Sequence, residues 1–113
     1  MLKINGKNTK LQVRFANDPW QRLKGLMFED EKNFNYALLF ENPSESKINS
    51  AVHMIFVFFP IDIIFLNKTK KVVDKITLLP FTPNYTPKKP AQYFIEMPKG
   101  KASKIKIGDK IEW

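Results

Sequence analysis

The sequence predicts a mainly β protein: a β-sandwich or a curled, barrel-like sheet of about seven or eight short strands, with one short helix in the N-terminal half. Apolar residues are grouped in short runs, and several runs alternate with polar residues in the period-two pattern of strands. Eight prolines and four glycines separate these runs, so turns are frequent. Only one stretch carries the residues that start and stop a helix.

The chain length and the lack of cysteine limit the class of protein. A chain of 113 residues suits one compact domain, so we expect residues 1–113 to fold as a single unit. Without cysteine, disulfides, iron–sulfur clusters, thiolate zinc sites and thiol nucleophiles are excluded. The first residues lack the apolar run of a signal peptide, and the apolar stretch 51–66 is too short to span a bilayer. We therefore expect a soluble cytoplasmic protein without a membrane partner.

The helix is predicted to begin at residue 19. Asp18 is a favourable N-cap, Pro19 suits the first helical position, and Gln21 completes a capping box. Gly25 can adopt the left-handed conformation that ends a helix, so the helix should last about two turns. The side chains that it should bury are Trp20, Leu23 and Leu26.

The strands are predicted from apolar runs and turn residues. Asn5-Gly6 predicts a tight turn between strands at 2–4 and 11–15, so the chain should open as a β-hairpin. Pro60 cannot donate to a sheet and divides the long apolar stretch into two strands. Residues 41–50 and 79–91 are rich in Pro, Ser or Asn and are expected to be connections. Further strands are expected at 36–40, 51–58, 61–66, 72–78 and 93–97, and a last one follows the turn at 107–111.

Two ionisable residues lie in the apolar stretch 51–66: His53, the only histidine of the chain, and Asp62. Burial of either group requires hydrogen-bond partners. His53 is interpreted as a core residue with one hydrogen bond or as a ligand contact. Asp62 either accepts backbone N–H groups at a strand entry or lines a pocket with a shifted pKa, and the second role is also open to Glu96.

Met27 and Met54 have the same two interpretations. Met27 follows the helix stop at Gly25 and first suggests a core residue. Both methionines could otherwise form part of an adaptable apolar binding groove.

Known catalytic patterns are absent from the sequence. Neither a GxGxxG nor a Walker pattern occurs, and no HxH or HExxH spacing is present, so the sequence predicts no cofactor and no metal. A triad of Ser50, His53 and Asp62 is disfavoured, because Ser50 and His53 would point to opposite faces of an extended strand.

The net charge of +8 is unevenly distributed, with +2 in residues 1–60 and +6 in residues 61–113. A basic half can attract nucleic acid or another polyanion. Only two of the nineteen basic residues are arginine, the residue best suited to phosphate recognition, so nucleic-acid binding is possible but not favoured. The lysines that would form such a surface are Lys68, Lys70, Lys71, Lys88, Lys89, Lys99, Lys101, Lys104 and Lys106.

A series of short motifs in a specific order resembles the domain-of-unknown-function 192 family. The motifs are Lys24-Gly25-Leu26-Met27-Phe28, Leu38-Leu39-Phe40, His53-Met54, Phe59 to Leu66, Ala91-Gln92-Tyr93, Glu96 to Gly100, and Gly108-Asp109. The resemblance implies a small mainly-β, sandwich-like domain with a short helix near its N-terminus, in a family without an established activity. The family's recurring positions would then be Gly25, Met27, Met54, Pro60, Asp62, Glu96, Gly100, Gly108 and Asp109, whereas His53 stands where the family often has Trp.

We expect a binding module without catalytic activity, in which an apolar cleft near the 79–91 loop takes an unidentified small molecule or peptide. The candidate ligand-binding residues are Met27, His53, Met54, Asp62 and Glu96. One alternative is a hydrolase-like enzyme in which Asp62 or Glu96 acts as a base with His53, which requires the three side chains to converge. The other is polyanion binding through the lysine-rich second half.

Overall fold

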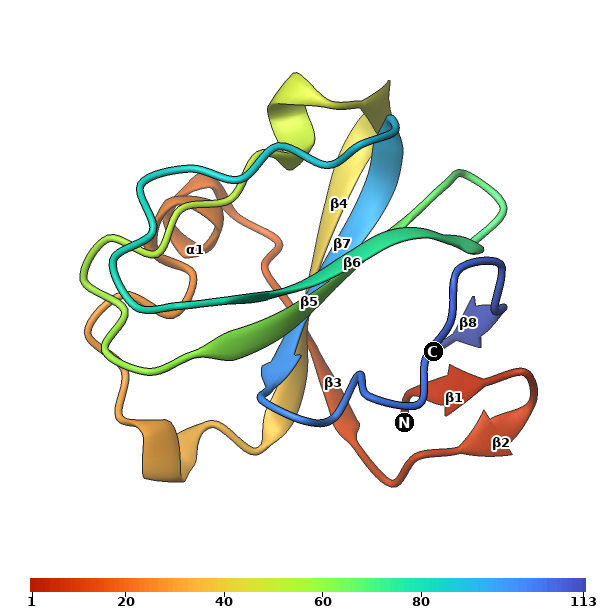
Figure 1. The fold of residues 1–113 in the computed structure, drawn as a ribbon, viewed down its shortest axis with the longest axis horizontal. Coiled ribbons are helices and arrows are strands. Elements are labelled where there is room, and N and C mark those ends of the chain that lie inside the picture. The colour runs from red at the N-terminus through yellow and green to blue at the C-terminus, as the bar shows by residue number, and fades with distance from the viewer.

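The protein is built on a five-stranded sheet with the strand order β3-β4-β7-β5-β6 (Figure 1). The computed structural model describes residues 1–113, with the side chain of Pro19 left out. The strands are β3 (Gln12–Phe15), β4 (Tyr36–Ser46), β5 (Ile61–Leu66), β6 (Val72–Leu78) and β7 (Ala91–Pro98). β3 and β4 are parallel, and the other neighbours are antiparallel. The sheet remains open, with β3 and β6 at its edges.

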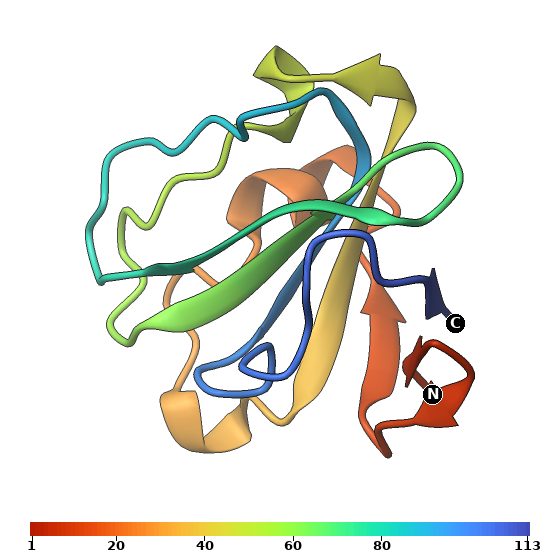
Figure 2. The same cartoon turned by 45° about the vertical axis from the view of Figure 1, so that its right-hand side comes forward.

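A second, three-stranded sheet joins the two ends of the chain (Figures 1 and 2). It contains β1 (Lys3–Ile4), β2 (Lys7–Asn8) and β8 (Ile111–Glu112). Asn5 and Gly6 form the predicted tight turn, with φ angles of 50° and 83°. The predicted hairpin partner is wrong, because β1 pairs with β2 whereas residues 12–15 pair with β4. The turn therefore forms where the sequence predicted it, but it joins β1 to the two-residue strand β2 and not to a strand at 11–15.

Period-two alternation divides the five-stranded sheet into two apolar faces. One face presents Phe40, Ile63 and Phe94 to a core that includes Leu26 and Met54 from the loops. The residues next to these in the strands, Leu39, Ile64 and Ile95, face a second core formed with the small sheet and the 102–105 turn. Every residue of β5 is buried, as predicted for a central strand. The fold is therefore a two-sheet, mainly β arrangement, as the sequence predicted.

Helix α1 (Pro19–Lys24) begins where predicted. Asp18 Oδ1 accepts a hydrogen bond from Gln21 N at 2.7 Å, and Gly25 is the C-cap. The predicted burial of Trp20 and Leu23 is wrong: these side chains are 67% and 63% exposed. The helix is so short that Leu26, just beyond it, supplies the buried contact with the sheet. Two 3-10 helices, η1 (Glu31–Asn33) and η2 (Ile48–Ser50), lie in later connections.

The structure corrects two of the predicted strands. β4 continues to Ser46, so most of the expected connection at 41–50 is strand. The strand predicted at 51–58 does not form; there the backbone bridges Tyr85 at Val52 and then turns, with a left-handed Phe56 at φ 58°. β7 occupies the position between β4 and β5, so this apolar segment covers one face of the sheet instead of joining it. Among the described residues, no helix is long and apolar enough to cross a membrane.

Candidate binding pocket

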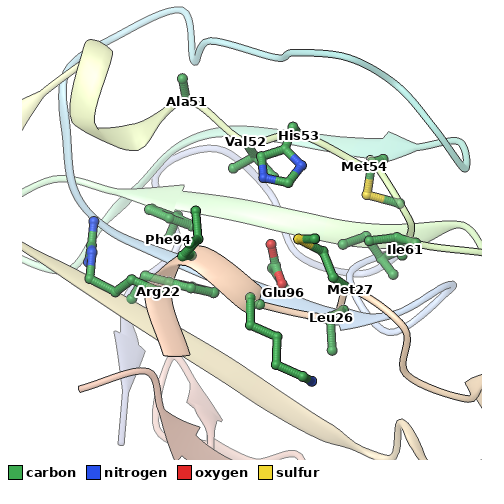
Figure 3. A pocket seen from close by; sticks show the side chains of 15 residues that line it. Arg22, Leu26, Met27, Ala51, Val52, His53, Met54, Ile61, Phe94 and Glu96 are labelled. Atoms are coloured by element: carbon green, nitrogen blue, oxygen red, sulfur yellow. The ribbon is translucent and has the colours of Figure 1, made fainter. Parts of the chain in front are cut away.

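A small cavity of about 60 Å³ lies between the sheet, the end of α1 and the segment 51–54 (Figure 3). This volume suits an end group of a few non-hydrogen atoms, since sites for drug-sized ligands have roughly 300–1,000 Å³. The lining residues are Arg22, Leu23, Lys24, Gly25, Leu26, Met27, Phe40, Ala51, Val52, His53, Met54, Val57, Ile61, Phe94 and Glu96. Four of the five predicted site residues therefore share one pocket.

Glu96 lies at the centre of the cavity floor. Its position in β7 is opposite Leu38 of β4 and Ile63 of β5, both of which belong to the core on this face. The carboxylate points away from the sheet toward His53, with Phe94 on one side and Met27 on the other (Figure 3). The alternation of β7 thus places a carboxylate where a strand in a buried sheet normally carries an apolar side chain.

The Glu96 carboxylate is buried without compensation. It is only 5% exposed, and its Oε1 atom has no hydrogen-bond partner among the described residues. Burial raises the pKa of Glu96 from 4.5 to about 8, because the charged form loses its hydration. The group therefore tends to keep its proton at neutral pH. A buried polar atom without a partner in a cavity is the usual signature of a missing water or ligand.

Two cationic side chains border the pocket, but both bind elsewhere. Arg22 donates from Nη1 to Glu41 O at 2.8 Å and from Nη2 to Asn42 Oδ1 at 3.0 Å. Lys24 Nζ forms an ion pair with Glu29 Oε1 at 2.7 Å. These contacts draw both cations away from Glu96, so they fix α1 against its neighbours rather than neutralising the buried carboxylate.

His53 and Met54 form part of the pocket wall opposite the sheet (Figure 3). Their segment is held by the 79–86 loop, because Met54 N donates to Thr82 O at 2.7 Å and Phe81 N donates to Met54 O at 2.9 Å. His53 is half-buried, and its Nδ1 accepts a hydrogen bond from Ile55 N at 3.3 Å. This bond assigns the proton of the neutral ring to Nε2. His53 is therefore a pocket residue rather than a member of the core.

The same segment is anchored to the sheet through Tyr85. Val52 and Tyr85 exchange backbone hydrogen bonds of 2.8 and 2.7 Å. The Tyr85 hydroxyl donates to Asp74 Oδ2 at 2.6 Å, and this buried carboxylate also accepts from Lys88 N. Burial and the bond to Asp74 raise the pKa of Tyr85 to about 12. Asp74 in β6 therefore positions the wall of the pocket at a distance, through one tyrosine.

Gly25 brings the chain close to Glu96 at the end of α1. Its backbone has φ 49° and ψ −121°, a conformation that L-residues with a side chain rarely adopt. A Cβ atom at this position would lie 3.8 Å from Glu96 Oε1 and from Phe40 Cζ, which is ordinary contact. The glycine is thus needed for its backbone conformation, which turns the chain so that Leu26 and Met27 face the pocket.

Asp62, the fifth predicted site residue, lies outside this pocket and lines a separate cavity of about 390 Å³ together with Thr77 and the turn at 99–103. It is 4% exposed; its Oδ1 accepts from Thr77 Oγ1 at 2.7 Å and its Oδ2 from Gly100 N at 2.9 Å and Ala102 N at 3.0 Å. The expectation that Asp62 accepts backbone N–H groups is confirmed. The groups belong to the turn after β7 rather than to its own strand entry.

The predicted catalytic arrangements do not assemble. Asp62 is paired with Met97, whereas Glu96 is paired with Ile63, so the two carboxylates lie on opposite faces of the sheet. The convergence of Asp62, Glu96 and His53 that the hydrolase alternative required is therefore absent. Ser50 bonds Asn42 and the Ala91 carbonyl, so the disfavoured triad is also excluded. Within the described residues, no group of three or more Asp, Glu and His side chains is arranged to hold a metal ion.

The sequence interpretation missed several parts of the pocket. Phe40 and Phe94 form a stacked pair in its wall, with ring centroids 4.5 Å apart, and Arg22 lies at its edge. The alternation of side chains puts Phe94 on the same face of its strand as Glu96, and this pattern could have identified Phe94 as a pocket residue. No local signal identifies Phe40 or Arg22, because their place in the pocket depends on the pairing of β4 with β7.

An aromatic cluster is exposed next to the pocket segments. Phe28 and Phe56 stack with ring centroids 4.9 Å apart, and Phe58 meets Phe81 edge to face at 5.3 Å. Phe28, Phe56 and Phe81 all have positive φ angles, between 58° and 63°. Such conformations cost about 1–2 kcal/mol for a residue with a side chain. The loops around the pocket therefore adopt strained conformations that surrounding contacts must maintain.

The fold and the pocket together define a small two-sheet β protein with a carboxylate buried beneath its single α-helix. The chain belongs to the DUF192 family, described as Uncharacterized ACR, whose model matches residues 1–113.

Relatives in the family are similar over the whole fold. A UPF0127 protein of Pyrococcus furiosus is 43% identical over 116 residues, which cover 100% of this chain and 97% of the relative. A UPF0127 protein of Thermococcus sibiricus is 40% identical over 113 residues, or 98% of this chain and 71% of the relative. The crystal structure of a protein of unknown function from Novosphingobium aromaticivorans matches with a TM-score of 0.83 at 23% identity, over 99% of this chain and 83% of that chain. These similarities support the family and the fold.

Proposed function

We propose that this protein is a non-enzymatic binding module whose pocket takes the end group of a small ligand and pairs it with Glu96. The observation that carries the proposal is the Oε1 atom of Glu96, which is buried at a cavity and has no partner among the described residues. Leaving such an atom unpaired costs about 1–3 kcal/mol. A ligand that supplies the missing hydrogen bond recovers this free energy on binding.

The walls of the cavity support binding of a partly apolar group. Met27 and Met54 present flexible thioethers, and Phe40 and Phe94 present an aromatic surface. His53 adds one polar contact, since its Nε2–H group is not used by the bond that Nδ1 accepts. A few polar groups among mostly apolar walls are typical of small-molecule sites.

Binding is favoured over catalysis because the acid–base groups are too few. With Asp62 on the opposite face and Lys24 paired with Glu29, the described residues leave Glu96 and His53 as the uncommitted groups for proton transfer in the pocket. The sequence suggested two catalytic arrangements: a triad of Ser50, His53 and Asp62, and a site with Asp62, Glu96 and His53. Each needs three side chains that converge, and each includes Asp62. Polyanion binding by the lysines of the second half is a separate surface hypothesis and does not use this pocket.

The proposal is tested with ¹³C-methyl methionine spectra, which report directly on Met27 and Met54. A panel of neutral, cationic and anionic probes of three to five non-hydrogen atoms is titrated in phosphate buffer. We expect at least one class of probe to shift both methyl signals in a saturable way, and the Met27→Trp variant, which fills the cavity, to abolish the shift of Met54.

The Phe28→Trp variant is the matched control, because it enlarges the neighbouring, exposed side chain without entering the cavity. It should bind the same probes as the parent. Saturable shifts that persist in Met27→Trp would place binding elsewhere. Unchanged methyl signals across the whole panel would overturn the proposed function.

A further inference from the structure

The pocket buries one acid and provides no free cation to neutralise it. We propose that its ligand is a short primary alkylamine, whose ammonium group pairs with Glu96 and whose alkyl chain extends to the mouth beside Leu23 and Ala51. This inference rests on the proposed function and specifies the chemical class of the ligand. The argument depends on charge, on the chemistry of the walls and on size.

The charge argument follows from the contacts of the neighbouring cations. Arg22 is bound to Glu41 O and Asn42 Oδ1, and Lys24 is paired with Glu29, so neither reaches the buried carboxylate as a partner. A buried carboxylate is stable in its charged form when it is paired with an opposite charge or accepts several hydrogen bonds, as Asp62 does, and Glu96 Oε1 has neither among the described residues. A ligand ammonium group supplies both the charge and the donors, whereas an anionic ligand would be repelled once Glu96 ionises.

The walls around Glu96 suit a cation. Phe40 and Phe94 are stacked beside it, and the faces of aromatic rings carry negative charge that attracts ammonium groups. The sulfur atoms of Met27 and Met54 are weak acceptors with polarisable electrons (Figure 3). The aromatic and thioether groups tolerate a positive charge, although Arg22 already lies over the Phe40 ring at 6.0 Å, so the specificity for a cation belongs to the carboxylate.

The size of the cavity selects a primary amine. A volume of about 60 Å³ accommodates an ammonium group and one or two carbons, but a quaternary ammonium group would fill it with methyl groups and leave no donor for Glu96. Leu23 and Ala51 line the cavity and are exposed and half-buried respectively, so the alkyl chain can continue outward along these apolar side chains.

Ion pairing makes the affinity depend on pH. In the empty pocket the carboxyl binds a proton below about pH 8, so an alkylammonium ion must displace that proton on binding. The affinity should rise up to about tenfold per pH unit between pH 6 and 8 and then level off. The other charged or titratable groups that border the pocket are His53, Arg22 and Lys24, and Lys24 carries Glu29 as its partner. Tyr36 of the neighbouring strand β4 also interacts electrostatically with Glu96. The His53→Asn variant shows how much of the pH dependence of the affinity comes from the histidine.

The experiment compares three probes of equal length: n-propylammonium, n-propanol and propionate. Affinities are measured from the Met27 and Met54 methyl signals in phosphate buffer at pH 8, and again at pH 6 for the parent and His53→Asn. We expect n-propylammonium to bind at least about tenfold more tightly than either other probe. Glu96→Gln should remove this preference, while n-propanol binding to the same variant shows that the pocket is intact.

The outcomes separate the inference from the proposed function. Binding of n-propanol or propionate that equals or exceeds binding of n-propylammonium would overturn the alkylamine, although the pocket would still be a binding site. An unchanged n-propylammonium affinity in Glu96→Gln would also overturn it. If none of the three probes shifts the methionine signals, both the inference and the proposed function are wrong. The exposed Glu112→Gln variant should behave as the parent throughout.

Discussion

Asp62 and Glu96 occupy adjacent strands of one sheet, yet their carboxylates lie on opposite faces. Ile63, the residue after Asp62, is the cross-strand partner of Glu96, and side chains alternate along a strand, so a shift of one residue separates the two acids completely. Asp62 accepts three hydrogen bonds on one face, whereas Glu96 Oε1 has no partner on the other among the described residues. The two buried acids therefore differ in their contacts: Asp62 ties its strand to the turn after β7, whereas Glu96 faces the cavity.

Replacement of Asp62 by asparagine should destabilise the fold. The amide can place its one acceptor oxygen where Oδ2 lies, but the bonds from Gly100 N and Ala102 N then lose their charged acceptor, and the Thr77 hydroxyl faces an amide donor instead of an acceptor. We expect a loss of about 2–4 kcal/mol in the free energy of unfolding, measured by urea denaturation at pH 7. Thr77→Val, which removes only the hydroxyl donor, should cost about 1 kcal/mol. A loss below that of Thr77→Val would show that Asp62 does not hold the turn.

Replacement of Glu96 by glutamine should change the pH dependence of stability. The folded-state pKa of about 8 lies above the ordinary 4.5, so the folded protein holds a proton that the unfolded chain has released between these values. The free energy of unfolding of the parent should therefore fall as pH rises from about 5 to 8, by up to about 1.4 kcal/mol per pH unit, and then level off.

Glu96→Gln should lack this slope and be about 2–4 kcal/mol more stable than the parent at pH 9, after allowance for an unpaired amide. Urea unfolding in buffers without primary amines checks this, with the exposed Glu112→Gln as the control. Equal slopes for parent and Glu96→Gln would assign the titration to other groups.

Replacement of Gly25 by alanine should destabilise the protein through the backbone. The space around the new Cβ is sufficient, but φ 49° with ψ −121° is strained for an L-residue. We expect a cost of about 1–3 kcal/mol in thermal or urea unfolding. A semisynthetic protein with D-alanine at this position is the control, because the mirror-image residue favours this conformation. An equal cost for both alanines would indicate a steric effect instead of backbone strain.

Replacement of Tyr85 by phenylalanine should loosen the pocket wall from a distance. The change deletes the 2.6 Å hydrogen bond to Asp74 while keeping the ring against Phe65. We expect a loss of about 1–3 kcal/mol, since the acceptor is a buried carboxylate, together with a shift of the Met54 methyl signal. Tyr36→Phe, which keeps its ring beneath Arg14, should change stability by less than about 0.5 kcal/mol and leave the Met54 signal in place. An unmoved Met54 signal in Tyr85→Phe would contradict the proposed anchoring.

Much of the fold could be predicted because its signals are local. The N-cap at Asp18, the turn at Asn5-Gly6 and the strands at 61–66 and 72–78 all formed where the sequence placed them. The segment 51–58 could not be assigned correctly, because apolar residues bury equally well in a central strand or as a cover over a sheet face. Trp20 and Leu23 were misplaced for a related reason: a short helix shows too few turns to reveal which side faces the core.

The sequence by itself determined which residues were unusual: one histidine, the acids Asp62 and Glu96 within apolar runs, and two methionines. It also showed the alternation that puts Phe94 and Glu96 on one face of a strand. Only the tertiary structure decided which of these residues meet. The register of β5 against β7 sent Asp62 to the other face, and the packing of α1 and the 51–54 segment over Glu96 enclosed the cavity. Both are long-range arrangements of segments far apart in the chain, which no local pattern of residues specifies.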